Sequence, residues 1–156
     1  MASKSRPSKA WNIRHAFSQW RACAPKWGVL AWFVQGTAAT LPFADRVMDS
    51  VVMTRTLCSV PEPLTALREI KRVLKQQGKL LFVEHGLAPH HRVGRWQRRL
   101  APLWRLVSGG CHLDRKVDDL IRAAGFELEE LDSKYAEGPR LFTYFYQGCA
   151  RPTPTG

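Results

Sequence analysis

Acidic residues are absent from the N-terminal part of the chain, whose first carboxylate is Asp45. Cysteine is also scarce, and no CxxC pair occurs among the four: Cys23, Cys58, Cys111 and Cys149. This wide spacing excludes the common zinc-binding patterns and a dense disulfide framework. The default expectation is therefore a reducing, cytoplasmic setting.

Long hydrophobic runs are missing as well. The apolar stretch at residues 27–34 is too short to span a bilayer, and the basic start of the chain lacks a small-residue cleavage site. We therefore expect no secretion signal. The acid-free, arginine-containing start also fits an organellar transit peptide, which is the less favoured alternative.

The formal net charge of +11 is concentrated in two segments. Residues 1–28 hold six basic residues and residues 90–105 hold five arginines, and neither segment contains an acid. The rest of the chain is balanced in charge, which predicts a near-neutral globular domain with two basic appendages. Nucleic acid is not the expected partner, because basic aromatic stretches alone give only salt-sensitive, unspecific affinity.

The composition predicts one globular domain. An apolar fraction of 45% is ordinary for a folded protein, and 156 residues suffice for one core. We expect a loosely ordered basic segment at residues 1–20, a domain over residues 21–150 and a tail at residues 151–156. Within that domain, residues 86–112 are expected to form a cap-like insertion.

Apolar periodicity predicts alternating helices and strands. A strand at 50–57, a helix at 64–75 stopped by Gly78 and a strand at 80–83 have the size of a right-handed parallel crossover. The other expected elements are a helix at 13–24, a strand at 29–34, a turn at 41–45, an amphipathic helix at 91–105 interrupted by Pro102, a helix at 114–124, and strands at 126–131 and 141–146. The last two strands are expected to pair antiparallel.

Five segments occur in the order and spacing of a known family. They are GTA at 36–38 with LPF at 41–43, MDSVV at 48–52, LREIKRVL at 67–74, LLFVEH at 80–85 and AAGF at 123–126. Over about residues 20–150 the chain resembles class I S-adenosylmethionine-dependent methyltransferases of the Methyltransferase-11 type. It is most similar to the ubiquinone and menaquinone biosynthesis type and to relatives with a Leu-Cys-Ser-Val-Pro segment, here at 57–61.

The resemblance implies an α/β fold, a Rossmann-like sheet whose third to seventh strands correspond to these segments. Parallel strands and a C-terminal antiparallel pair are expected. The first strands and the glycine-rich cofactor loop have no counterpart, because only Gly28 and Gly36 precede residue 50. The expected fold is therefore an incomplete methyltransferase sheet.

S-adenosylmethionine is the cofactor that the resemblance implies. The cofactor contacts are expected at Gly36, Thr37, Ala38 and Thr54, with the Ala38 backbone beside the adenine. Thr37 stands where relatives usually carry an aspartate that accepts a hydrogen bond from the adenine amino group. Its hydroxyl is a weaker, neutral acceptor.

Polar residues follow two of the expected strands. Arg55 has two interpretations, contact with an anionic substrate or an arginine that reaches water. Glu84 and His85 are interpreted either as acid and base toward a substrate or as part of a polar turn. Methyl transfer from a sulfonium depends chiefly on alignment, so no catalytic residue is assigned.

Zinc-ligand residue types gather in the second half of the chain: His85, His90, His91, Cys111 and His112. Their spacing matches no zinc signature, so no metal site is predicted.

Two functions are expected from these observations. The first is methyl transfer to a small, apolar or lipid-like acceptor. The alternative is a non-catalytic, truncated methyltransferase that acts as an interaction module and forms oligomers through an exposed sheet edge. The basic helix at 91–105 is interpreted as a substrate cap, with contact to an anionic membrane surface as the alternative.

Overall fold

The computed structural model describes residues 34–154. The chain splits into two compact units, Met1–Gln35 and Gly36–Gly156, and all described helices and strands belong to the second unit. The expected helix at 13–24 lies outside the described residues, and so does the expected strand at 29–34 apart from its last residue.

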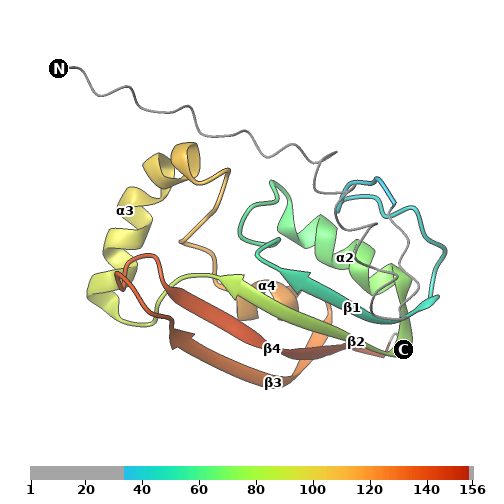
Figure 1. The fold of residues 1–156 in the computed structure, drawn as a ribbon. Coiled ribbons are helices and arrows are strands. Elements are labelled where there is room, and N and C mark those ends of the chain that lie inside the picture. Colours follow the sequence, from blue (N-terminus) through green and yellow to red (C-terminus); the bar gives the residue numbers. More distant parts are fainter. Residues whose placement is uncertain (1–33, 155–156) are drawn as a thin grey trace, which may run out of the picture. The chain divides into compact units, whose positions relative to one another are not determined.

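A four-stranded sheet organises the second unit (Figure 1). Its strands are β1 (Met48–Thr54), β2 (Leu74–His85), β3 (Phe126–Tyr135) and β4 (Tyr144–Pro152), in the spatial order β1-β2-β4-β3. β1 and β2 pair in parallel, whereas β4 is antiparallel to both of its neighbours. The structure thus confirms the expected parallel crossover and the antiparallel pair at the C-terminal end.

The crossover helix is α2 (Pro63–Val73), with proline in its first turn, where no backbone donor is needed. Gly78 does not stop this helix, contrary to the expectation from the sequence. It lies inside β2, where a Cβ atom would stand 3.1 Å from the carbonyl oxygen of Met48. Gly78 therefore permits a close approach of two strands.

One face of the sheet carries the core. α2 and the short helix α4 (Val117–Ala123) pack on this face and on each other. The largest buried apolar side chains include Leu67, Leu74, Leu80, Phe82 and Ile121. Strand periodicity places the alternate residues on the opposite face, where Val52 on β1 is 69% exposed.

The helix α3 (His91–Val107) stands beyond the carboxyl ends of β1 and β2 (Figure 1). Pro102 does not interrupt it, contrary to expectation: the helix continues past this exposed residue to Val107. The buried Gln97 side chain anchors the helix by accepting from the Ala88 N–H at 2.8 Å and donating to the Leu141 carbonyl at 3.1 Å. None of the described helices is long and apolar enough to cross a bilayer.

Candidate functional site

The site begins where β1 and β2 end side by side. The two strands stay paired up to Thr54 and Val83, and the Arg55 N–H then donates to the Val83 carbonyl at 2.8 Å. Arg55 has a φ of +52°, a left-handed conformation that a non-glycine residue rarely adopts. The backbone thus turns sharply at the carboxyl edge of the sheet, the edge where open α/β sheets bind ligands.

Glu84 holds this turn from the neighbouring strand. Its side chain is fully buried, and its two carboxylate oxygens accept from the Thr56 N–H at 2.7 Å and the Cys58 N–H at 3.2 Å. Burial raises the pKa of Glu84, although these hydrogen bonds oppose the shift. Of the two interpretations offered by the sequence, the geometry favours the polar turn, because both oxygens are occupied by backbone donors.

Arg115 holds the same turn from the opposite side. Its guanidinium donates to the Leu57 carbonyl, to the Val60 carbonyl at 2.7 Å and to the Pro61 carbonyl at 3.3 Å. The carbonyl of the intervening residue, Cys58, accepts from the His112 N–H at 2.6 Å. The turn is therefore fixed in place by charged side chains and by backbone hydrogen bonds.

Three chemically reactive side chains converge beside this turn: Cys58, His85 and Cys111. All three are buried, and one ligand atom of each lies within 4.8 Å of the other two. The Cys111 Sγ stands 3.8 Å from His85 Nδ1. We call these three residues the thiol–imidazole cluster.

The two thiols of the cluster differ in acidity. The hydrogen bond from Cys58 lowers the pKa of Cys111 to about 7, and the Trp104 indole N–H and the charge of Arg55 act in the same direction. The pKa of Cys58 is raised, first because it donates to Cys111 and then because it is buried. Trp104 Nε1 is buried without a hydrogen-bond partner. Cys111 is thus the more acidic of the two thiols.

The residues that the sequence assigns to the cofactor lie on two elements. Gly36, Thr37 and Ala38 belong to a short turn before β1, in which Thr37 bridges to Thr40 and its Oγ1 accepts from the Ala39 N–H at 3.3 Å. Thr54 is the exposed last residue of β1. Among residues 34–154 no hydrogen bond joins that turn to Thr54, and their joint role stays a prediction.

The sequence does not single out the cluster, because its members lie far apart in the chain. Residue type groups His85 and Cys111 with His90, His91 and His112, and it does not point to Cys58. His90 and His91 are exposed at the start of α3. The only available signal was that Cys58 and His85 each follow a parallel strand closely, and parallel strands end at one edge.

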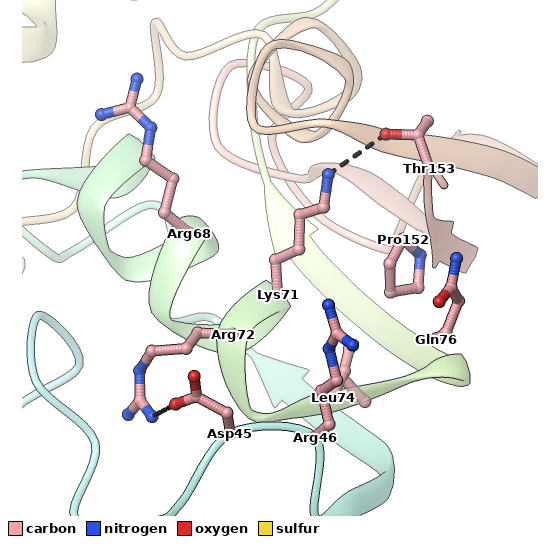
Figure 2. Close-up of a pocket in the computed structure, with 9 residues that line it drawn as sticks. All are labelled: Asp45, Arg46, Arg68, Lys71, Arg72, Leu74, Gln76, Pro152 and Thr153. Atoms are coloured by element: carbon pink, nitrogen blue, oxygen red, sulfur yellow. Dashed lines mark hydrogen bonds and ion pairs between the residues drawn. The ribbon is translucent and has the colours of Figure 1, made fainter. Parts of the chain in front are cut away.

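A separate cationic cavity of about 280 Å³ lies at the other end of β1 (Figure 2). It is lined by Arg46, Arg68, Lys71 and Arg72 among others. Figure 2 shows Lys71 directed at Thr153, to which its Nζ donates at 3.1 Å, and Arg72 directed at Asp45. These two cations therefore serve contacts within the protein.

Comparisons with known proteins show similarity to methyltransferases over part of the chain. The family profile described as "Methyltransferase domain" matches residues 12–82. Thiol S-methyltransferase TMT1B of Rattus norvegicus is 43% identical over 90 residues, which cover 57% of this chain and 37% of that protein. Over these residues the chain is similar to methyltransferases.

A second methyltransferase relative supports this similarity. The demethylmenaquinone methyltransferase of Paenarthrobacter aurescens (strain TC1) is 36% identical over 112 residues, covering 72% of this chain and 35% of that protein. The chain thus spans little more than a third of the length of these curated relatives.

Solved structures confirm the expected Rossmann-like methyltransferase fold. An S-adenosylmethionine-dependent methyltransferase from Methanosarcina mazei has a TM-score of 0.64 at 21% identity, covering 81% of this chain and 69% of its own. The [4+2]-cyclase SpnF has a TM-score of 0.66 at 20% identity, covering 92% of this chain and 64% of its own. These likenesses concern the fold alone, and a cyclase among them means that the fold does not fix the reaction.

Proposed function

We propose that this chain takes part in transferring the methyl group of S-adenosylmethionine to a small, apolar acceptor. The observation that carries the proposal is the shared carboxyl edge of β1 and β2, with Thr54 and the turn after it, in a chain similar to methyltransferases. Ligands of open α/β sheets bind at this edge.

The turn at residues 36–38 supports a role in holding the adenine end of the cofactor. At Gly36 a Cβ atom would stand 3.0 Å from Pro42 Cδ, so the backbone of this turn is closely packed. The Thr37 hydroxyl has a second lone pair free to accept from an adenine amino group. When bound, S-adenosylmethionine supplies a methyl group on a sulfonium, and the protein's task is to align the acceptor with it and to exclude water.

A thiol is the acceptor that we propose to test first. The rat and human relatives at 43% and 40% identity are thiol S-methyltransferases, and a quinone precursor is the second choice because of the demethylmenaquinone methyltransferase. The apolar, lipid-like character of the acceptor is supported by α3. Trp96, Leu103 and Leu106 are exposed on this arginine-rich helix beyond the sheet edge, which also supports contact with an anionic membrane surface.

Calorimetric titration of the full chain with S-adenosylmethionine tests the cofactor part of the proposal. We expect micromolar binding that tightens in Thr37→Asp, because a carboxylate accepts more strongly from the adenine amino group. Thr40→Asp is the matched control, because it puts the same charge on the other side of the same turn. The absence of binding in the unmodified chain and in both variants would refute the proposal.

Transfer of a labelled methyl group tests the acceptor part. A small alkyl thiol is compared with a naphthoquinol under conditions in which the cofactor is bound. Transfer to the thiol supports the proposed acceptor, transfer to the quinol alone reassigns it, and binding without any transfer contradicts the enzymatic function.

Interaction with a partner is the second candidate function, and the bare face of the sheet favours it. Val52, Leu81 and Val83 expose apolar surface there, although large apolar side chains in a sheet are normally covered. The candidate occupant is the same face of a second copy. A native mass of a dimer that reverts to the monomer in Val52→Asp supports it, and a monomeric unmodified chain contradicts it.

A further inference from the structure

We propose that Cys58, His85 and Cys111 bind one Zn²⁺ ion. The three residues come from three separate elements: the turn after β1, the last position of β2 and the loop after α3. Tertiary folding alone brings their ligand atoms to within 4.8 Å of one another. This site is distinct from the proposed cofactor contacts, and the proposal does not depend on methyl transfer.

The separations suit a tetrahedral zinc site. Zn–S bonds of about 2.3 Å and Zn–N bonds of about 2.0–2.1 Å put tetrahedral ligand atoms about 3.6–3.8 Å apart. The Cys111 Sγ to His85 Nδ1 distance of 3.8 Å already has this length. No separation exceeds 4.8 Å, so each lies within roughly 1 Å of its value in a tetrahedral site.

Charge balance favours a divalent ion at this buried position. Zn²⁺ displaces the two thiol protons, which pass to solvent, and the two thiolates then cancel the charge of the ion. A neutral imidazole completes a site without net charge, which is the condition for burying ions at low cost. Thiolate and imidazole ligands select zinc over the oxygen-seeking Mg²⁺ and Ca²⁺.

A comparison within the chain argues against an ordinary core cluster. Cys149 is also a buried cysteine, but its Sγ lies 3.6 Å from a carboxylate oxygen of Glu129 and approaches no second thiol or imidazole among the described residues. Cys58 and Cys111, by contrast, meet each other and one histidine. Two sulfur atoms and one imidazole nitrogen within 4.8 Å of one another form a ligand set.

The surrounding contacts fix the ligands in place. The Cys58 N–H donates to Glu84 at 3.2 Å and its carbonyl accepts from the His112 N–H at 2.6 Å, so both backbone groups of this ligand are held. The His85 ring packs on Phe145 with 4.1 Å between ring centroids. The indole Nε1 of Trp104 is buried without a hydrogen-bond partner.

The ligand count leaves one coordination position open. Over residues 34–154, no fourth histidine, cysteine or carboxylate joins the three converging atoms. Three protein ligands with an open fourth position are the pattern of zinc sites that admit water or a substrate atom. The cluster lies at the carboxyl edge of β1 and β2, the edge where ligands of this fold bind.

Metal analysis of the full chain tests the proposal directly. The purified protein is stripped with a chelator, reloaded with Zn²⁺, passed through a desalting column and analysed for zinc by mass spectrometry. We expect one zinc per chain in the unmodified protein and at least a tenfold weaker affinity in Cys58→Ser and in Cys111→Ser. Cys149→Ser, a buried cysteine outside the cluster, is the matched control and is expected to retain zinc.

Replacement of zinc by Co²⁺ gives a readout that needs no variant. Tetrahedral thiolate ligation is expected to produce a sulfur-to-cobalt charge-transfer band and intense visible d–d bands. Less than a tenth of one zinc per chain, zinc retained in both Cys58→Ser and Cys111→Ser, or an octahedral cobalt spectrum would overturn the proposal. A Cys58–Cys111 disulfide that persists in the presence of reductant and excess zinc would overturn it as well.

Discussion

Two polar clusters of this molecule have opposite characters. Arg72 lies in the last turn of α2 and fixes the loop before β1. Its guanidinium donates to the Leu41 and Phe43 carbonyls and to the carboxylates of Asp45 and Glu69. Each of these charges has its partner within the protein. In the thiol–imidazole cluster, by contrast, Cys111 Sγ lies 3.8 Å from His85 Nδ1, and Cys58 Sγ makes only weak thiol contacts of 3.5 Å, to the Arg55 carbonyl and to Ser59 Oγ.

The difference separates a structural contact from a candidate binding site. A saturated network has no free donor or acceptor, so it fastens a loop and offers little to a ligand. Buried groups that converge without full pairing retain the capacity to bind an ion. Glu84 and Arg115 lie around the thiol–imidazole cluster, and their side chains are hydrogen-bonded within the protein, as that of Arg72 is. They form a framework that holds the three side chains of the cluster.

Glu84→Ala is expected to have the largest effect, because it breaks this framework. The backbone N–H groups of Thr56 and Cys58 lose their buried acceptors. Each unsatisfied buried group costs about 1–3 kcal/mol, so the free energy of unfolding should fall by about 2–5 kcal/mol. Urea unfolding measures this change.

The control for this variant is Glu69→Ala, which removes a carboxylate from the Arg72 cluster. Its effect should be smaller, because water can reach the groups that it leaves behind. An equal loss in the two variants would contradict the distinction between a buried framework and a surface contact.

Arg115→Met is expected to have the next largest effect. Its guanidinium links the Leu57, Val60 and Pro61 carbonyls, but the side chain is partly exposed and water can replace part of these bonds. We expect a loss of about 1–2 kcal/mol in urea unfolding. Arg122→Met, which breaks an exposed pair with Asp118 on α4, is the control and should change stability little.

Much of the fold could be predicted from the sequence. A parallel crossover is predicted by three features: the near-continuous apolar residues of β1, the apolar face of α2 and the apolar residues before Glu84. Buried parallel strands have few polar positions, so such apolar segments indicate them. The extension of β2 back to Leu74 was missed, since Gly78 resembles a helix stop. In the sequence, a buried glycine that allows two strands to approach closely looks the same as a glycine that ends a helix.

The candidate site was harder to predict. Glu84 and His85 were recognised, but their roles depend on partners that only the tertiary structure supplies. Cys58 precedes Cys111 by more than fifty residues, and no periodicity links them. Sequence spacing detects zinc ligands on one hairpin or helix, and it fails where ligands come from three elements joined by a sheet edge.

The pH dependence of stability should sharpen the comparison, because the pKa values of two carboxylates are displaced in opposite directions. Burial raises the folded-state pKa of Glu84 above 4.5, so its folded form binds a proton at higher pH than its unfolded form. The stability that this group contributes is therefore present at low pH and is lost as pH rises through its folded-state pKa. Arg72 and the Leu41 N–H lower the pKa of Glu69, so its contribution is present above 4.5 and is lost toward acid.

Urea unfolding over about pH 3 to 8 checks these signs with Glu84→Gln and Glu69→Gln as references. The stability difference between the unmodified chain and Glu84→Gln should shrink as pH rises, whereas the difference from Glu69→Gln should grow. If both stability differences changed with pH in the same direction, the two carboxylates would not differ in environment.

Arg72→Lys is expected to have the smallest effect on stability. Lysine keeps the charge and a contact to Asp45, but its point-like ammonium cannot reach the two carbonyls and two carboxylates that the planar guanidinium reaches. The midpoint of thermal unfolding should fall by less than in Arg115→Met, and the zinc content should stay unchanged. If Arg72→Lys lowered the zinc content as strongly as Cys111→Ser, the two clusters would be coupled, and the loop before β1 would belong to the same functional unit as the thiol–imidazole cluster.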